Sequence, residues 1–175
     1  QGADFGVVGD EPVTSTSNGR SYGVEFLAQQ RLNKNYYYII SLTYVVSEFE
    51  NGDNVYTASS WDNRTIISMT AGKKFKKNWE LGLKWRYSGG LPYTPYDQEY
   101  SSLTYVWDIY RQGVPDFSKL NAERLDPYHQ LDMRVDKKWF FDKWNLDVYV
   151  DVQNVYNFQT TFQPYIDVVK DADGN

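Results

Sequence analysis

The chain of 175 residues contains no cysteine, which excludes a disulfide scaffold and a cysteine-ligated zinc site. A single histidine, His129, is too few for a histidine-based zinc centre. No apolar run reaches the ~20 residues that a membrane-spanning helix requires. The sequence also lacks a P-loop, a serine-hydrolase elbow and a zinc-protease motif. We therefore expect no enzymatic activity, no cofactor and no metal site.

Excess positive charge is missing as well. The formal net charge is −5, and lysine and arginine are spread through the predicted turns and strands rather than clustered. Because phosphate neutralisation requires clustered basic side chains, we expect no nucleic-acid partner.

Alternating apolar and polar residues dominate six segments, a pattern that predicts β-strands with one apolar face. The segments are 20–32, 36–49, 64–75, 79–87, 130–141 and 144–155. They exceed the ~5–6 residues of an ordinary strand and reach the ~9–11 residues that a tilted membrane strand needs. The residues that we expect to face lipid are Tyr22, Val24, Phe26, Ile40, Leu42, Leu81, Leu83, Trp85, Val135, Val148 and Val150.

Connections between these segments come in two sizes. Tight turns are predicted at 33–35, 76–78 and 142–143, and long polar loops at 50–62 and 88–128. In the first two hairpins, apolar residues fall on the same side if Leu32 lies opposite Tyr36 and Phe75 lies opposite Trp79.

The last hairpin has two registers that keep its apolar residues together. One places Asp136 opposite Asp147, which is repulsive. The other closes on the two-residue turn and places Lys138 opposite Asp147 and Arg134 opposite Asp151. We predict the second register because it pairs opposite charges.

Short turns at one end, long loops at the other and strand ends rich in Tyr, Trp and Phe are typical of a transmembrane β-barrel. We therefore predict an all-β, antiparallel, up-and-down barrel-wall segment of about six strands at 20–158, between loops at 1–19 and 159–175. Single-chain membrane barrels begin at about eight strands. The chain is then either a piece of a larger polypeptide or one of several copies that close a barrel together.

Five segments between residues 18 and 158 stand out: NGRSYGVEF at 18–26, SWDNR at 60–64, YSGGLPYTPY at 87–96, LNAERLDPYHQLD at 120–132 and DVQNVYN at 151–157. Together they resemble the C-terminal barrel portion of TonB-dependent outer-membrane receptors of the Bacteroidetes type. Their order and spacing on successive predicted strands carry the resemblance.

The resemblance implies a place in a 22-stranded barrel in the outer membrane of a Gram-negative bacterium. It implies import of a scarce nutrient, such as an iron chelate, a vitamin or a glycan. The implied partners are the rest of the barrel with its plug domain, TonB acting through a missing N-terminal part, outer-membrane lipid and a surface lipoprotein. The family's final strand is not recognisable, and 159–175 reads as a loop leading toward it.

The longest loop contains six aromatic residues that we expect to face a ligand or to pack the loop against itself. They are Tyr93, Tyr96, Tyr100, Tyr105, Trp107 and Tyr110. We expect His129 to be structural, at the membrane interface where a loop re-enters a strand. The acidic segments 171–175 and 50–54 are predicted to be Asp-Gly turns rather than calcium loops, which need further ligands. The alternative function is a secreted carbohydrate-binding β-sandwich or β-barrel module with the aromatic residues as its sugar platform.

Overall fold

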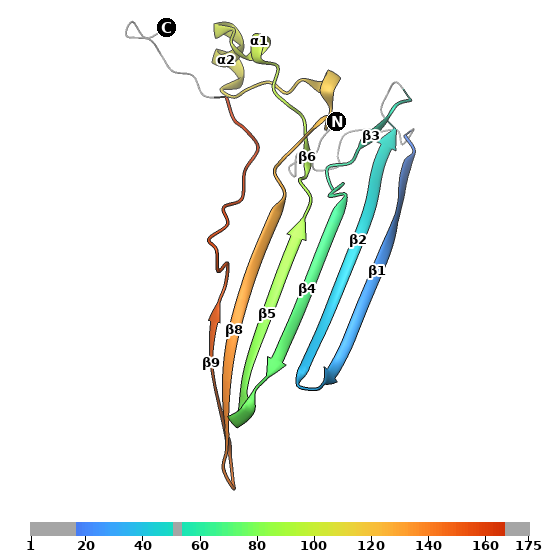
Figure 1. Cartoon of the computed structure of the whole chain (residues 1–175). Coiled ribbons are helices and arrows are strands. Elements are labelled where there is room, and N and C mark those ends of the chain that lie inside the picture. The colour runs from blue at the N-terminus through green and yellow to red at the C-terminus, as the bar shows by residue number, and fades with distance from the viewer. Residues whose placement is uncertain (1–16, 51–53, 167–175) are drawn as a thin grey trace, which may run out of the picture.

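A single antiparallel sheet dominates the computed structural model, which describes residues 17–50 and 54–166 (Figure 1). Its long strands follow one another in sequence order, each paired with the next. They are β1 (Gly19–Asn33), β2 (Tyr36–Glu50), β4 (Thr65–Lys74), β5 (Trp79–Ser88), β8 (Tyr128–Phe140) and β9 (Asn145–Val152). A short strand, β3 (Tyr56–Ala58), pairs with β2 beyond the end of β4. The prediction of an all-β antiparallel fold is confirmed.

The connections divide the molecule into two ends. The tight turns of the β1–β2, β4–β5 and β8–β9 hairpins lie together at one end, called here the turn end (Figure 1). The long connections and the short helices gather at the opposite end, called the loop end (Figure 1). Residues 1–16 of the predicted loop at 1–19, the acidic segment at 171–175 and residues 51–53 of the other acidic segment lie outside the described residues.

The first hairpin follows the predicted register over most of its length but closes differently. Gln30 pairs with Tyr38 as predicted, whereas the register shifts before the turn and Asn33 pairs with Tyr36. The predicted Leu32–Tyr36 pair is therefore wrong. Lys34 and Asn35 form a two-residue turn with φ of 47° and 72°. Both lie in the left-handed region that a type I′ turn requires, and this turn follows the twist of the strands.

The other two hairpins have the predicted registers. The Phe75 N–H donates to the Trp79 carbonyl (2.7 Å), and pairing continues in that register along β4 and β5. In the third hairpin Lys138 lies opposite Asp147, with 3.4 Å between Nζ and the carboxylate, and Arg134 lies opposite Asp151.

One of the two charge pairs used to predict the last register does not form an ion pair. The Arg134 guanidinium instead contacts the Asp136 carboxylate (2.7 Å) and lies 3.8 Å from the centre of the Tyr149 ring. The predicted register is confirmed, but of the two ion pairs that were expected to stabilise it only Lys138–Asp147 forms.

Pairing across all the long strands places the apolar positions on one surface, called the apolar face. It consists of the even-numbered residues of β1, β2 and β9 and the odd-numbered residues of β4, β5 and β8. One row across the strands shows the continuity: Phe26–Leu42–Ile67–Tyr87. The opposite surface, called the polar face, carries most of the Ser, Thr, Asp, Glu and Arg of the strands.

Within residues 17–50 and 54–166 the sheet is a single layer, and no other element covers either face (Figure 1). Val24 and Phe26 are 69% and 62% exposed. Among the described residues only two hydrophobic side chains are buried, Val46 near the loop end of β2 and Val106 in the loop region. The strands therefore enclose no hydrophobic core of their own.

Some predicted boundaries are wrong by a few residues. The third long strand begins at Thr65 and not at Arg64, because Arg64 takes a left-handed φ of 60°. The last strand ends at Val152, two residues before Asn154, which also has a left-handed φ of 53°. Strand β8 begins earlier than predicted, at Tyr128.

The loop at 88–128 contains short elements that alternation along the sequence does not reveal. They are the paired strands β6 (Pro92–Tyr93) and β7 (Glu123–Arg124), the helices α1 (Gln98–Ser101) and α2 (Thr104–Tyr110), and the 3₁₀ turn η2 (Phe117–Lys119). A further 3₁₀ turn, η1 (Lys76–Asn78), closes the β4–β5 hairpin. No helix in the described ranges is long and apolar enough to cross a membrane.

Candidate functional site at the loop end

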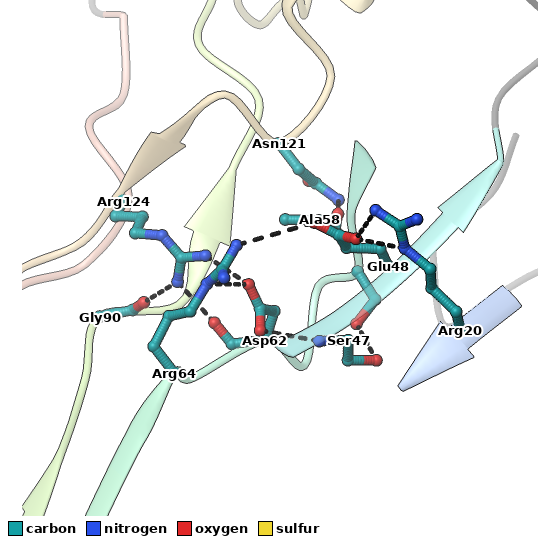
Figure 2. Close-up of polar contacts among 10 residues, drawn as sticks. Arg20, Ser47, Glu48, Ala58, Asp62, Arg64, Gly90, Asn121 and Arg124 are labelled. Carbon is teal, nitrogen blue, oxygen red and sulfur yellow. Dashed lines mark hydrogen bonds and ion pairs between the residues drawn. The ribbon is translucent and has the colours of Figure 1, made fainter. Parts of the chain in front are cut away.

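A buried carboxylate, Asp62, organises the loop end of the sheet. Its side chain is fully buried and contacts two guanidinium groups, Arg64 Nε at 2.8 Å and Arg124 Nη2 at 2.5 Å (Figure 2). The backbone N–H of Ser47 donates to the other carboxylate oxygen (3.0 Å). Both oxygens of the buried charge are therefore satisfied, the condition under which a carboxylate can be kept out of water.

Arg124 joins this carboxylate to the long loop. Its Nη1 donates to the backbone carbonyls of Asp62 (2.5 Å) and Gly90 (3.0 Å) (Figure 2). Gly90 also lies against the Leu125 carbonyl, and a Cβ added at Gly90 would be 1.6 Å from that oxygen. Only glycine fits this close approach between the two ends of the loop.

Further contacts extend the cluster to neighbouring segments. The Asn121 amide donates to the Ala58 carbonyl (2.8 Å), which joins the long loop to β3 (Figure 2). On the other side, Glu48 of β2 contacts Arg20 of β1 (2.7 Å) and lies 4.0 Å from Arg64 (Figure 2). These contacts and those of Asp62, called together the Asp62 cluster, hold the loop-end segments together.

A shallow hollow of ≈ 380 Å³ lies farther out on the long loop. Its lining is mainly polar and consists of Pro95, Tyr96, Asp97, Gln98, Asp116, Lys119 and Glu123. An aromatic ring beside hydrogen-bonding side chains is suited to a polar ligand that also has an apolar face, such as a sugar.

The carboxylates of this hollow already have partners in the loop. Asp97 accepts from the Tyr100 N–H at the start of α1 (2.8 Å). Hydrogen bonds from Ser118, and next from Lys119, hold the pKa of Asp116 below its ordinary value. Glu123 accepts from the Tyr93 hydroxyl (2.6 Å), and this bond raises the pKa of Tyr93. In the described parts of the chain no group of acidic or histidine side chains is arranged to hold a metal ion.

The six predicted loop aromatics do not converge on one site. Tyr96 lines the hollow, and Tyr93 is tied to Glu123. Tyr100, Tyr105 and Tyr110 are exposed on the two short helices, and Trp107 is half-buried. No ring contact joins any two of the six within the described ranges. That these residues face a ligand stays a prediction. Tyr96 is the best candidate, because it lines the hollow.

His129 occupies the second position of β8, on the apolar face opposite Tyr87. Its Nδ1 lies 2.7 Å from the Tyr156 hydroxyl, and its ring centre lies 4.1 Å from that of Phe158. This aromatic environment fits the expected structural position near the loop end of the strand.

No separate signal in the sequence predicts the Asp62 cluster, although several of its members lie in the segments that carry the resemblance. Asp62 and Arg64 belong to 60–64, Arg124 to 120–132 and Gly90 to 87–96. In the structure Arg124 hydrogen-bonds to both Asp62 and Gly90 and so joins the three segments. The residues 60–64 and 120–132 are far apart in the sequence, so only the folded chain reveals the contact.

Comparison of the chain with protein-family models, with curated proteins and with solved structures finds no match.

Proposed function

We propose that this chain is a wall segment of an outer-membrane β-barrel, the C-terminal part of a TonB-dependent receptor that imports a scarce nutrient. The long strands would cross the membrane with their apolar face toward lipid. The loop end would face the exterior and the turn end the periplasm. The nutrient class, whether an iron chelate, a vitamin or a glycan, is left open by the proposal.

One observation carries the proposal: a continuous apolar face over six long strands that no other described element covers. Water is a poor solvent for such a surface, because burying apolar area is worth roughly 25 cal/mol per Å². Monomeric soluble proteins rarely expose continuous apolar patches larger than a few hundred Å². The hydrocarbon core of a membrane is a partner that suits the whole face at once.

The stagger of the hairpins supports a barrel rather than a flat sheet. Tyr36 at the first turn pairs with Lys73, so the second hairpin continues beyond it. Trp79 at the second turn pairs with Lys137, and the third hairpin continues beyond that pair to its own turn. Each turn therefore steps past the one before it (Figure 1). Strands of a closed barrel must tilt and stagger in this way.

Within the described residues β1 and β9 each have one strand neighbour, so both outer edges of the sheet offer unpaired backbone groups. Edges of this length do not persist in hydrocarbon, where every backbone group needs a partner. Further strands of the same barrel would satisfy them.

The polar face is suited to line the interior of such a barrel. It carries the Arg134–Asp136 ion pair (2.7 Å) and the Arg86–Asp132 contact (3.5 Å). The Tyr37 hydroxyl donates to Glu80 (2.9 Å) on the same face. Charged groups in this position would face water or the plug, where a charged wall is tolerated.

The alternative, a secreted carbohydrate-binding β-sandwich, needs a second layer to cover the apolar face. The described residues supply no such layer. The polar hollow beside Tyr96 is the one observation in favour of sugar binding, and it is compatible with either function.

Membrane fractionation of the native host, probed with an antibody against residues 98–119, tests the proposal. We expect the antigen in the outer-membrane fraction, on a polypeptide several-fold heavier than the 20.5 kDa of this chain. A soluble secreted product of 20.5 kDa would contradict the proposal and favour the alternative.

A further inference from the structure

Charge on the apolar face is confined to its two ends. At the loop end, Arg20 pairs with Glu48. Between that pair and the tight turns, the described residues of the face include two lysines, Lys73 of β4 and Lys137 of β8, and no acidic side chain. Both lysines lie close to the turn end, which makes this end of the face positively charged.

Lys137 lies near two aromatic rings and Lys73 near one. The Lys137 ammonium lies 5.4 Å from the centre of the Trp79 ring and 5.3 Å from that of Trp139. It also donates to the backbone carbonyl of Lys77 in the turn. The Lys73 ammonium lies 5.4 Å from the centre of the Phe75 ring, next to the same turn. Both ammonium groups therefore extend toward the turns and away from the middle of the strands.

The positions of the two lysines follow the stagger of the strands. Lys73 lies opposite Leu81, and Lys137 lies opposite Trp79, which is nearer the turn. The β8–β9 hairpin also extends further than the β4–β5 hairpin. In a tilted barrel wall, a line of constant depth shifts toward the turn from strand to strand in this manner.

The turns add four more lysines to this rim. They are Lys34, Lys76, Lys77 and Lys143. The only acidic residue in the three turns is Asp142. Within the described residues none of the six lysines of the rim forms an ion pair with a carboxylate. At the loop end, by contrast, Arg20, Arg64 and Arg124 are each paired with an acidic side chain.

We propose that Lys73, Lys137 and the turn lysines form a site for anionic phospholipid headgroups in the leaflet at the turn end. The inference rests on the proposed function, because it needs the apolar face to lie in a membrane. A lysine at the edge of an apolar face extends its stem along the hydrocarbon and places its ammonium at headgroup level. Tryptophan rings favour the same level.

Charge complementarity selects an anionic headgroup over a zwitterionic one. Zwitterionic lipid offers a phosphate together with its own cation, whereas phosphatidylglycerol offers a phosphate with no competing cation. Attraction of a basic residue to an anionic surface is worth roughly fivefold in binding per lysine, and it is screened by salt. We therefore expect a preference for phosphatidylglycerol that declines as the salt concentration rises.

Spin-labelled lipids measure this preference in the full polypeptide that carries the segment, reconstituted in phosphatidylcholine vesicles. The electron spin resonance spectrum gives the fraction of each labelled lipid that is immobilised on the protein. We expect labelled phosphatidylglycerol to be enriched over labelled phosphatidylcholine. The double variant Lys73→Gln, Lys137→Gln should lower this enrichment several-fold.

The matched control is Lys74→Gln with Lys138→Gln, which removes the same charge from adjacent positions on the polar face. The control should keep the enrichment. Equal enrichment in the wild type and the Lys73, Lys137 variant, or an equal loss in the control, would overturn the inference and leave the proposed function intact. An absence of immobilised lipid of either kind would contradict the proposed function as well.

Discussion

At the scale of single residues, Asp62 joins parts of the chain that are distant in sequence. It contacts β2 through Ser47 and the long loop through Arg124. Breaking a buried ion pair from one side is costly, about 3–5 kcal/mol, because the remaining charges lose their partner. Here the side chains of Arg64 and Arg124 remain about one-third exposed. Water can therefore solvate their charges in part when the carboxylate is removed, and the loss of stability should be smaller.

We therefore expect Asp62→Ala to lower the stability of the loop end by about 2–3 kcal/mol. The measurement is hydrogen exchange at the Ser47 amide, which donates to this carboxylate. Asp108→Ala is the control, since Asp108 is 62% exposed and 3.7 Å from Arg111. Exposed pairs of this kind contribute about 0–1 kcal/mol. Unchanged protection at Ser47 in Asp62→Ala would mean that the cluster does not stabilise the loops.

Gly72 and Gly82 lie opposite each other on the polar face but differ in the room around them. A Cβ at Gly72 would be 2.3 Å from the ring of Tyr37, whereas at Gly82 the nearest atom is the Arg134 carbonyl oxygen at 3.9 Å. Tyr37 crosses Gly72 and reaches Glu80. Glycine in a strand interior often indicates such a close approach.

Gly72→Ala should therefore cost about 1–3 kcal/mol through overpacking, and Gly82→Ala much less. The free energy of unfolding, from urea titrations in detergent, measures both. In a Tyr37→Ala background the cost of Gly72→Ala should largely disappear, because the clashing ring is gone. Equal costs for the two glycine substitutions would show that the Tyr37 ring is not the cause.

At the scale of elements, the hairpins were the most predictable part of the molecule. Alternation fixed which residues share a face, and turn length with charge pairing fixed the registers of the second and third hairpins. The first turn was wrong by one residue, because the shift between Gln30 and Asn33 is not visible in an alternating pattern. A helix as short as α2 is stabilised by contacts with the rest of the loop. Its seven residues are too few for a helical period to be recognised in the sequence.

Cross-linking tests the register of the third hairpin directly, since the chain has no cysteine of its own. Val135 lies opposite Val150 in the observed register. The rejected register, with Asp136 opposite Asp147, would place Val135 opposite Val148. We expect Val135→Cys with Val150→Cys to oxidise to a disulfide readily, and Val135→Cys with Val148→Cys to do so poorly. The reverse order of yields would show that the register is wrong.

The 3₁₀ turn η2 depends on an ionised Asp116. Its carboxylate accepts from the Ser118 hydroxyl (2.5 Å), from Lys119 Nζ (3.0 Å) and from the Ser118 N–H (3.1 Å), and these partners hold its pKa below the ordinary value. A lowered pKa means that ionisation stabilises the folded turn above the pKa of the unfolded chain. That contribution is lost as the pH falls through the lower folded pKa.

The chemical shift of the Ser118 amide should therefore titrate with an apparent pKa below that of an unperturbed aspartate, about 3.9. Asp116→Asn should abolish this titration and leave the amide shift flat over the same range. A midpoint at or above the unperturbed value in the wild type would contradict the assigned role of Asp116.

At the scale of the whole molecule, the sequence predicted an unusual property that the structure retains: an apolar surface without a core. The alternation of residues predicted such a face, and the resemblance to outer-membrane receptors implied that lipid would cover it. The sequence could not predict the Asp62 cluster, because it arises from contacts between distant segments. The lysine rim was predictable in part, since Lys76, Lys77 and Lys143 lie in the predicted tight turns. Strand pairing is needed to place Lys73 and Lys137 beside them.

The central claim is that the apolar face of the sheet contacts lipid, and a nitroxide scan along β5 tests it most directly. Single cysteines are placed in turn at residues 79–88 of the full polypeptide in vesicles, labelled, and probed with oxygen and with a water-soluble nickel complex. We expect Leu81 and Leu83 to be accessible to oxygen from the membrane, and Gly82 and Lys84 to be shielded from it, in a two-residue period. Free access of the nickel complex to Leu81 and Leu83, or no alternation along the strand, would contradict the account.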